Sequence, residues 1–590
     1  MYDRRFLRSS ASFAILLLVA GFLLTACGGN KTIAAAVAPV FVSSPVTQAV
    51  EGSRYSYQVT VDGTAVTLSL TSAPIGATLS GNTISWTPTA GQSRVPNSFA
   101  VTATASGGAS ATQTWTVTPS GTIRISWIDT LWNESGSSTS KPFDWTPVTS
   151  FVAALVQQPD GSFTSLSGSV GATGAFEIPN VPAGYYWLRI APRGTYWTSS
   201  STFDMGSDIF SPVTNFTTPT VSTTSISFNF TSLDPAPASG LLQFDTPDGP
   251  FPRYSASTNP GSTTSLGGLS VGSNIDFSVI RNGFVRQYEA ASFGPVNGYV
   301  LGPELTLSNL SLTTGGFNTI SGALNPAVPA SINLSVKGSA WAPLFDRIAP
   351  TAPTATAGGF YLSVQPYIAA AGPNMLASVP IDLIWPKENT QIGVFFRTGV
   401  CSANPPFTTD VDAGTVQYSD PFPAAWRRIF RVCQSASVNV PVPGTSQPQS
   451  IDLGNNQTTA LPTTTVKPLL SGVLNPKING ADLFTATTVN STAVTLSWDP
   501  PAIGTPFGYN VAIMSPIASP TGTIHYFSLT TLSTAKTSMT IPPNVLGPGK
   551  TYIFVITSLA DGKANMETSP HRSSLPIANA DVISAPITTN

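Results

Sequence analysis

Few side chains in this 590-residue chain have the chemistry that catalysis or metal binding needs. The sequence holds three Cys and two His, His525 and His571. Zinc is held by Cys and His ligands at short spacings, and this inventory supplies no such set. Residues 268–272 fit the Gly-x-Ser-x-Gly pattern around Ser270, but that pattern serves a nucleophile only on a turn from strand to helix. We expect no helix there, so the pattern does not predict an enzyme.

Two Ser-x-x-Lys spacings, Ser138 with Lys141 and Ser533 with Lys536, could pair a serine nucleophile with a lysine base. Neither pair begins an expected helix, and no partner motif follows either of them. The paired carboxylates of a glycosidase cannot be recognised by spacing, because they are brought together only in three dimensions. We therefore predict that the chain is not an enzyme, with a hydrolase as the least favoured alternative.

Three tryptophans, Trp127, Trp132 and Trp145, lie close together in a Ser-rich, partly polar stretch. Flat aromatic faces with polar neighbours suit sugar rings, so the three could form a ligand platform for carbohydrate. The alternative is that they cover the core of their own domain, since Trp is highly buried on average.

The N-terminal residues have the layout of a secretory signal. Basic residues precede an uncharged apolar run at 13–24, which is short for a membrane span of about 20 residues. The following stretch, Leu-Thr-Ala-Cys-Gly-Gly at 24–29, resembles the bacterial lipobox. The resemblance implies a signal peptide at 1–27, a palmitate-type lipid anchor on Cys27 and a tether at 28–37. Gly28 in place of Asp favours the outer membrane. The alternative is an ordinary secretory signal with an incidental Cys.

Export bears on the two remaining cysteines, Cys401 and Cys433. Disulfides persist in oxidising compartments, so we predict a bond between them. The bond would close a loop with 31 residues between the two cysteines. In the chain-entropy description, such a loop contributes roughly 3–4 kcal/mol to the free energy of unfolding. Two free thiols are the alternative.

Composition favours an all-β chain of tandem β-sandwich domains. Charged residues make up 9% of the sequence, whereas typical soluble proteins have about 25%. The 52 Pro and 49 Gly punctuate short stretches rich in Thr and Val, as in many-stranded antiparallel domains. The length suggests several domains. The net charge of −2 does not indicate the basic surface that nucleic-acid binding requires.

Residues 38–119 alternate apolar and polar side chains with turn residues between, which predicts half-buried strands. The stretches at 50–57, 73–77 and 84–88 resemble the cadherin-like immunoglobulin domains of bacterial surface proteins. That family often binds calcium, an ion that takes six to eight oxygen ligands. Here the corresponding turn holds Asp62 alone, and the pair Asp410 and Asp412 is an equally weak indication. We therefore expect no metal and no cofactor.

Residues 121–230 are predicted to form a second sandwich. The stretch at 174–188, with its Asn-Val-Pro-Ala-Gly turn, resembles the carboxypeptidase regulatory-like domain, a small transthyretin-like fold without catalytic residues. Phe176 and Ile178 should face one core, to which Tyr186 and Leu188 return after the turn. Residues 231–470 are β-rich, resemble no family and are expected to form two domains.

The last predicted module, residues 484–588, resembles fibronectin type III. Trp498 supplies an aromatic core residue on an early strand, and residues 509–513 form the next strand. Tyr552 matches the tyrosine corner, in which the hydroxyl bonds to backbone a few residues upstream. These residues are structural in that family and indicate no ligand.

Two function classes follow from these resemblances. The first is a non-catalytic lipoprotein, surface-exposed or facing the periplasm, whose sandwiches serve cell adhesion or envelope interactions. The alternative is a carbohydrate-binding, substrate-capture lipoprotein. Both have the membrane as a partner through the lipid anchor, and protein or polysaccharide partners in the envelope. This is analogy at the level of the fold, because sandwiches host many functions.

Overall fold

The computed structural model is built almost entirely from β-strands, which confirms the all-β fold class. It describes part of the chain, and the N-terminal signal, Cys27 and Cys401 lie outside that part. The described residues are 37–132, 137–191, 193–210, 223–234, 241–245, 254–257, 265–271, 277–281, 283–293, 296–341, 343–344, 355–367, 384–386, 410–422, 424, 427–490, 494–518 and 524–590. Within these ranges, no helix has the length and apolar character to cross a membrane.

The chain divides into two compact units. The first comprises Met1–Val46, Ser56–Ser85 and Ser98–Trp115, and the second Thr47–Tyr55, Trp86–Asn97 and Thr116–Asn590.

Eight short strands between residues 40 and 117 make up the N-terminal sandwich. They are β1 (Val40–Phe41), β2 (Tyr55–Gln58), β3 (Val61–Asp62), β4 (Thr67–Ser72), β5 (Thr78–Ser80), β6 (Thr83–Trp86), β7 (Asn97–Thr104) and β8 (Ser110–Val117). The sheets have the orders β2-β6-β5 and β4-β7-β8, and β2, β6 and β7 alternate buried with more exposed positions, because successive side chains point to opposite faces. Within the first unit, the ring of Trp115 stacks on Phe99 at 5.1 Å and meets Tyr57 edge-on at 5.3 Å.

The second sandwich packs a four-stranded sheet against four strands that belong to a longer sheet. The four-stranded sheet has the order β14 (Ser169–Val170), β15 (Phe176–Val181), β9 (Gly121–Ser126), β18 (Thr202–Asp204). In the longer sheet, β12 (Val152–Gln157) pairs with β13 (Phe163–Ser167) and β16 (Tyr186–Ile190), and β16 pairs with β17 (Gly194–Thr198). Phe176, Ile178, Tyr186 and Leu188 lie in one buried cluster, which confirms the shared core predicted for them.

A small three-stranded sheet accompanies this sandwich. Its order is β11 (Ser138–Pro142), β10 (Ile128–Trp132), β19 (Asp208–Phe210).

The middle region contains two buried apolar clusters among its described residues. One gathers around β20 (Thr224–Thr231), β21 (Leu241–Asp245), β24 (Gly283–Phe293) and β26 (Phe317–Ala323), with Phe228 and Phe277 inside it. The other involves β25 (Val296–Leu307), β27 (Pro329–Val336) and β30 (Val411–Ser419), and it encloses Trp341. Two long strands, β28 (Ala355–Tyr367) and β31 (Arg427–Val440), pair antiparallel beside them.

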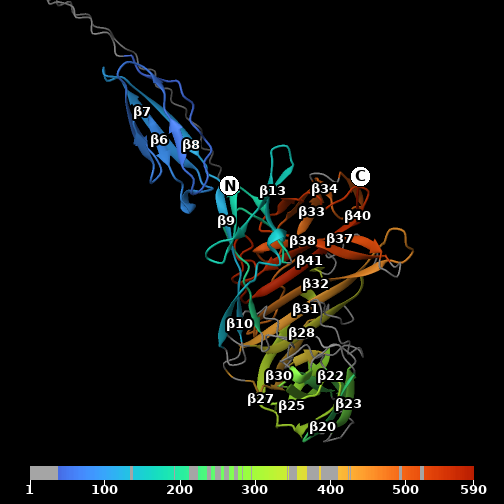
Figure 1. Ribbon diagram of the computed structural model, residues 1–590. Coiled ribbons are helices and arrows are strands. Elements are labelled where there is room, and N and C mark those ends of the chain that lie inside the picture. The colour runs from blue at the N-terminus through green and yellow to red at the C-terminus, as the bar shows by residue number, and fades with distance from the viewer. Residues whose placement is uncertain are drawn as a thin grey trace, which may run out of the picture. The chain divides into compact units, whose positions relative to one another are not determined.

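One continuous sheet runs from this region through the C-terminal module and into the second sandwich. From β31 it passes through β32 (Gln449–Ala460), β41 (Ile577–Ile583), β40 (Thr551–Ala560), β37 (Gly508–Ala518) and β38 (Ile524–Thr534) to β17. Figure 1 shows β31, β32, β41, β37 and β38 lying side by side. The tandem order along the chain therefore does not separate the second sandwich, the middle region and the C-terminal module, which share this sheet.

The C-terminal module faces part of this long sheet with a second sheet. That sheet has the order β34 (Ala481–Asp482), β33 (Leu474–Ile478), β36 (Thr495–Asp499), β39 (Ser538–Thr540). Trp498 is buried between the layers, where its ring contacts Tyr509 edge-on at 5.2 Å. The Gly547 N–H donates to the Tyr552 hydroxyl at 2.7 Å. The buried Trp and the hydrogen bond predicted for Tyr552 are both confirmed.

Candidate functional site

The three tryptophans predicted as a sugar platform do not form one. Trp127 and Trp145 are each 4% exposed and belong to the core of the second sandwich. The ring of Trp127 stacks on Phe143 with the centroids 3.7 Å apart. Trp132 is half-buried and donates its Nε1–H to Asp208 at 3.2 Å. This corrects the platform hypothesis, because burial removes two of the three aromatic faces from any ligand.

The serine patterns also lie in strands. Ser270 lies on strand β23 (Ser265–Val271), where it is the register partner of Ser225 on β20. A nucleophile elbow needs a sharp turn from strand to helix, and Ser270 is instead in extended backbone. Ser138 and Lys141 lie on β11, in register with β10. Ser533 lies on β38 and donates its hydroxyl to Asn510 at 2.7 Å.

Asp410 is one of the two acids, with Asp412, that gave a weak indication of a calcium site. Its carboxylate is bound by other side chains and backbone of the protein. Its carboxylate pairs with Lys337 and accepts hydrogen bonds from the Ser339 backbone N–H at 3.1 Å and hydroxyl at 2.7 Å. These contacts, led by Lys337, lower the pKa of Asp410 to about 2. Over the described ranges, no group of three or more His, Cys, Asp or Glu could hold a metal ion.

Two predicted covalent sites fall on residues outside the described part of the chain. Cys27, the predicted lipidation site, precedes the first described residue. Cys433 lies on β31, but its predicted disulfide partner Cys401 is outside the described ranges. Both remain predictions.

The feature that sequence reasoning missed is a seam between the second sandwich and the C-terminal module. β17 pairs in parallel with β38, with Trp197 opposite Thr534. Trp187 of the second sandwich is fully buried in a cluster with residues of the C-terminal core, and its Nε1–H donates to the Thr540 carbonyl at 3.0 Å. Trp187 and Thr540 are 353 residues apart along the chain, yet the two modules share a sheet and a core.

The loop between β40 and β41, residues 561–576, reaches across this seam, and we term it the clasp loop. Glu567 of this loop accepts four hydrogen bonds at the end of β17, because the Thr198 hydroxyl contacts both its carbonyl and, at 3.0 Å, its carboxylate. Its carboxylate accepts from the Tyr185 hydroxyl at 3.1 Å and the Ser199 N–H at 3.0 Å. Its carbonyl accepts from the Thr198 hydroxyl at 2.9 Å.

Two further clasp-loop residues, His571 and Arg572, contact the second sandwich. Arg572 pairs with Asp204 at 2.9 Å, and it donates to the Ile128 carbonyl at 2.9 Å. The Nε2 atom of His571 lies 2.9 Å from the Tyr196 hydroxyl. Burial, helped by the nearby positive charge of Arg193, lowers the pKa of His571 to about 4. The imidazole is therefore neutral at pH 7.

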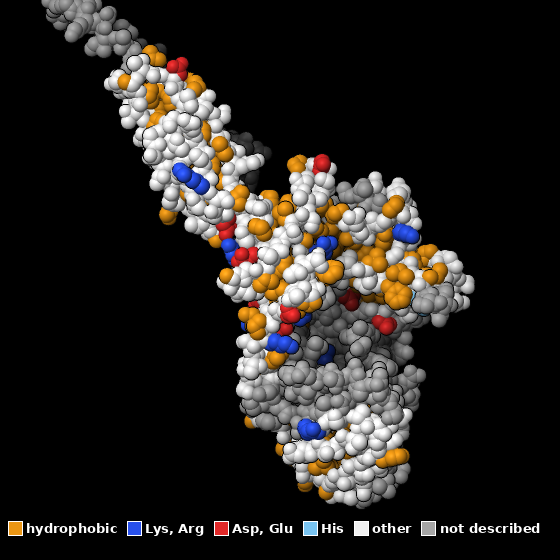
Figure 2. Space-filling view, in the orientation of Figure 1, with side chains coloured by type: hydrophobic (Ala, Val, Ile, Leu, Met, Phe, Trp, Pro, Cys, Tyr) orange, Lys and Arg blue, Asp and Glu red, His pale blue; other side chains and the backbone are white. Residues whose placement is uncertain are grey.

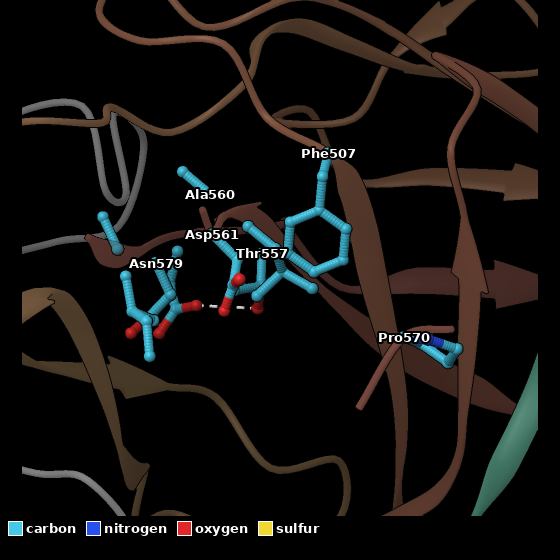
Figure 3. A pocket seen from close by; sticks show the side chains of 10 residues that line it. Phe507, Thr557, Ala560, Asp561, Pro570 and Asn579 are labelled. Atoms are coloured by element: carbon cyan, nitrogen blue, oxygen red, sulfur yellow. Dashed lines mark hydrogen bonds between the residues drawn. The ribbon is translucent and has the colours of Figure 1, made fainter. Parts of the chain in front are cut away.

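Beside the clasp loop, the C-terminal module has an open pocket of about 360 Å³ (Figure 3). Its lining comes from β40, β41, the clasp loop and the residue before β37. The lining residues are Phe507, Thr557, Leu559, Ala560, Asp561, Pro570, Ile577, Ala578, Asn579 and Asp581. Phe507 is half-buried and presents an aromatic ring to a cavity that also holds two carboxylates.

The two carboxylates of the pocket differ in surroundings. Asp581 accepts from the Thr557 hydroxyl at 2.7 Å and from the Gly454 N–H at 2.8 Å. Burial raises its pKa above the ordinary value, because the ionised form loses contact with water. Asp561 accepts backbone N–H bonds from Lys563, Ala564 and Ser574 at 2.7–2.9 Å and so orders both ends of the clasp loop.

The sequence contains a faint signal for this pocket. In the run Ile-Ala-Asn-Ala-Asp-Val-Ile at 577–583, Asn579 and Asp581 are spaced two apart within an otherwise apolar strand. A strand that places polar groups on one face of a buried sheet is a candidate for a polar site. No comparable signal identifies the clasp contacts, which join residues hundreds of positions apart.

The surface outside the pocket has few charges. Figure 2 shows few Lys, Arg, Asp and Glu side chains on the visible face, some of them next to a side chain of opposite charge. This agrees with the 9% charged composition and the net charge of −2.

Comparison with known proteins identifies one domain. Residues 38–120 match the family model described as "Putative Ig domain". No curated protein matches the chain.

Several solved structures are weakly similar to this chain. SGBP-B of the Bacteroides ovatus mixed-linkage glucan utilization locus, in complex with a mixed-linkage heptasaccharide, has 12% identity over 65% of this chain and 97% of its own, with a TM-score of 0.13. An Antarctic bacterium's Ca²⁺-stabilized adhesin that binds ice has 11% identity over 85% and 95%, with a TM-score of 0.12. Salmonella alpha-2-macroglobulin has 10% identity over 93% and 42%, with a TM-score of 0.10. These TM-scores are too low to bear on function. Residues 38–120 are thus an immunoglobulin-like domain within an all-β chain.

Proposed function

We propose that this chain is a non-catalytic lipoprotein of a bacterial envelope, which uses its β-sandwich modules to bind a partner in adhesion or envelope interactions. The observation that carries the proposal is the double role of the clasp loop. Asp561 and Pro570 of this loop line the pocket, while Glu567 and Arg572 hold the second sandwich. Docking of the two modules thereby fixes one wall of the pocket.

A fixed wall suits a binding protein. Ligand sites occur preferentially near domain interfaces, and they bind best when rigid elements hold them in place. The long sheet from β31 to β17 supplies that rigidity, because each strand is hydrogen-bonded to its neighbours. The double substitution Glu567→Ala and Arg572→Ala should therefore weaken sedimentation with isolated envelope of a soluble form that begins after Cys27, in which the lipid anchor plays no part. Unchanged sedimentation would argue against a role for the clasped pocket.

The anchor is tested separately. Lipidation at Cys27 supplies acyl chains whose burial contributes about 0.8 kcal/mol per methylene, so the mature chain should stay in the membrane fraction. Cys27→Ala should release the protein or leave it unprocessed, and intact mass should lose the acyl increment. Cys401→Ala is the matched control and should remain lipidated. An unlipidated mature wild-type chain would refute the anchor.

Carbohydrate capture is the second candidate function. It is favoured by the aromatic ring of Phe507 facing polar side chains in the same pocket, an arrangement that suits a sugar ring. On a glycan array, the mature protein should then bind a glycan, Phe507→Ala should abolish binding and Trp132→Ala should leave it. A blank array would remove this candidate.

A further inference from the structure

We propose that the pocket beside the clasp loop binds an organic cation, with an ammonium or guanidinium head held between the Phe507 ring and the carboxylates of Asp561 and Asp581. The inference rests on the proposed binding function and names the chemical class of ligand. It is carried by the charge of the pocket lining, by the contacts of Asp581 and by the shape of the cavity.

The lining of the pocket is negative and has no counter-charge of its own. Two of its ten residues are acids, and none is Lys, Arg or His. The groups that hold Asp581 in place, the Thr557 hydroxyl and the Gly454 N–H, are neutral donors. Asp561 likewise accepts from backbone N–H groups and from the Ser573 hydroxyl.

A carboxylate in this position gains most from a cationic ligand. Removing an ionised carboxyl from water is costly unless an opposite charge accompanies it. Burial already raises the pKa of Asp581. A cation that enters the pocket stabilises the ionised form and forms charge-assisted hydrogen bonds, which are about twice as strong as neutral ones.

The rest of the cavity suits an organic cation better than a bare metal ion. The Phe507 ring can attract a cation through its π-face. Leu559, Pro570 and Ile577 provide apolar contact for an alkyl chain. Calcium takes six to eight oxygen ligands, whereas no group of three His, Cys, Asp or Glu in the described ranges could hold a metal. A volume of about 360 Å³ lies in the range of small-molecule sites.

Titration calorimetry of the mature full-length protein with agmatine tests the proposal, and neutral methyl glucoside serves as the comparison ligand. We expect saturable agmatine binding that strengthens as pH rises, because burial raises the pKa of Asp581 and its carboxyl ionises over that range. Binding should weaken with added salt. Asp581→Asn should reduce affinity at least tenfold.

Two other variants distinguish loss of the binding site from loss of folding. Ala560→Phe fills the pocket and keeps both carboxylates, and it should also reduce agmatine affinity at least tenfold. Asp160→Asn removes an exposed carboxyl that orders a turn through Ser162, and it should bind agmatine as the wild type does. Thermal melts show which variants are folded.

The outcomes separate this inference from the proposed function. Failure of the wild-type protein to bind agmatine overturns the cation class, as does equal affinity in Ala560→Phe. Methyl glucoside binding without agmatine binding assigns the pocket to saccharides and leaves the binding function standing. Failure of the unsubstituted soluble form to sediment with envelope, together with a blank glycan array, would instead count against the binding function itself.

Discussion

At the scale of single residues, His571 makes the clasp loop sensitive to acid. Its pKa is about 4 in the folded chain, against about 6.5 when unfolded. The unfolded state therefore binds the extra proton first, and stability falls as pH decreases from about 6.5 to about 4. Arg193 opposes the charged imidazole and Asp204 favours it. A shift of this size corresponds to roughly 3 kcal/mol.

Urea unfolding at pH 7 and pH 4.5 measures this effect. His571→Gln should flatten the difference in unfolding free energy between the two pH values, because Gln does not titrate. His525→Gln is the matched control, since His525 is exposed, and it should keep the wild-type difference. Equal pH dependence in all three proteins would show that His571 is not the sensitive group.

Tyr552 offers a second prediction at this scale. Tyr552→Phe removes the hydroxyl that accepts the Gly547 N–H while keeping the ring in the core. Loss of one such hydrogen bond should cost about 1–2 kcal/mol. The Gly547 amide should also exchange faster with solvent. Unchanged exchange at Gly547 would mean that the hydrogen bond contributes nothing to the corner.

At the scale of elements, the clasp loop is the connection whose loss should separate the two modules. Glu567→Ala removes the carboxylate that accepts from the Tyr185 hydroxyl, the Ser199 N–H and the Thr198 hydroxyl, and only Thr198 keeps an acceptor, the backbone carbonyl of residue 567. Two lost partners should cost roughly 1–3 kcal/mol, and hydrogen exchange should rise in β17 and in the clasp loop together. Asp62→Ala, an exposed acid of the N-terminal sandwich, is the control and should change neither segment. Faster exchange in the loop alone would mean that it does not hold β17.

At the scale of the whole molecule, the second sandwich should depend on the C-terminal module. A chain that ends before residue 484 lacks β38 and the Thr540 carbonyl, so it leaves β17 as a sheet edge and exposes Trp187. We expect the second sandwich to melt roughly 5–10 °C lower, since 1 kcal/mol corresponds to about 4–8 °C in a domain of this size. Tryptophan fluorescence reports the transition. An unshifted melt would mean that the modules are independent.

The sequence predicted the individual strands of this fold better than it predicted which strands and side chains they contact. Alternation at Phe176, Ile178, Tyr186 and Leu188 predicted one shared core, and the structure has it. For Trp127 and Trp145 the platform hypothesis was wrong and the alternative, burial in the core of their own domain, is confirmed, because strands far apart in the sequence surround them. The candidate pocket was missed for that reason too. Phe507 and Asp581 are 74 positions apart, and local pattern gives no sign that they meet.

By itself, the sequence determined the strand content of this protein. It also determined short-range features, such as the turn after Phe176 and the hydrogen bond of Tyr552. These depend on side-chain alternation and turn chemistry within about ten residues. It also supports the predictions of the Cys27 anchor and the bond between Cys401 and Cys433. Only the tertiary structure decided that β17 joins β38, that Glu567 clasps the second sandwich and that two acids share a pocket. Such contacts form between segments far apart in the chain, so their energies leave no local pattern.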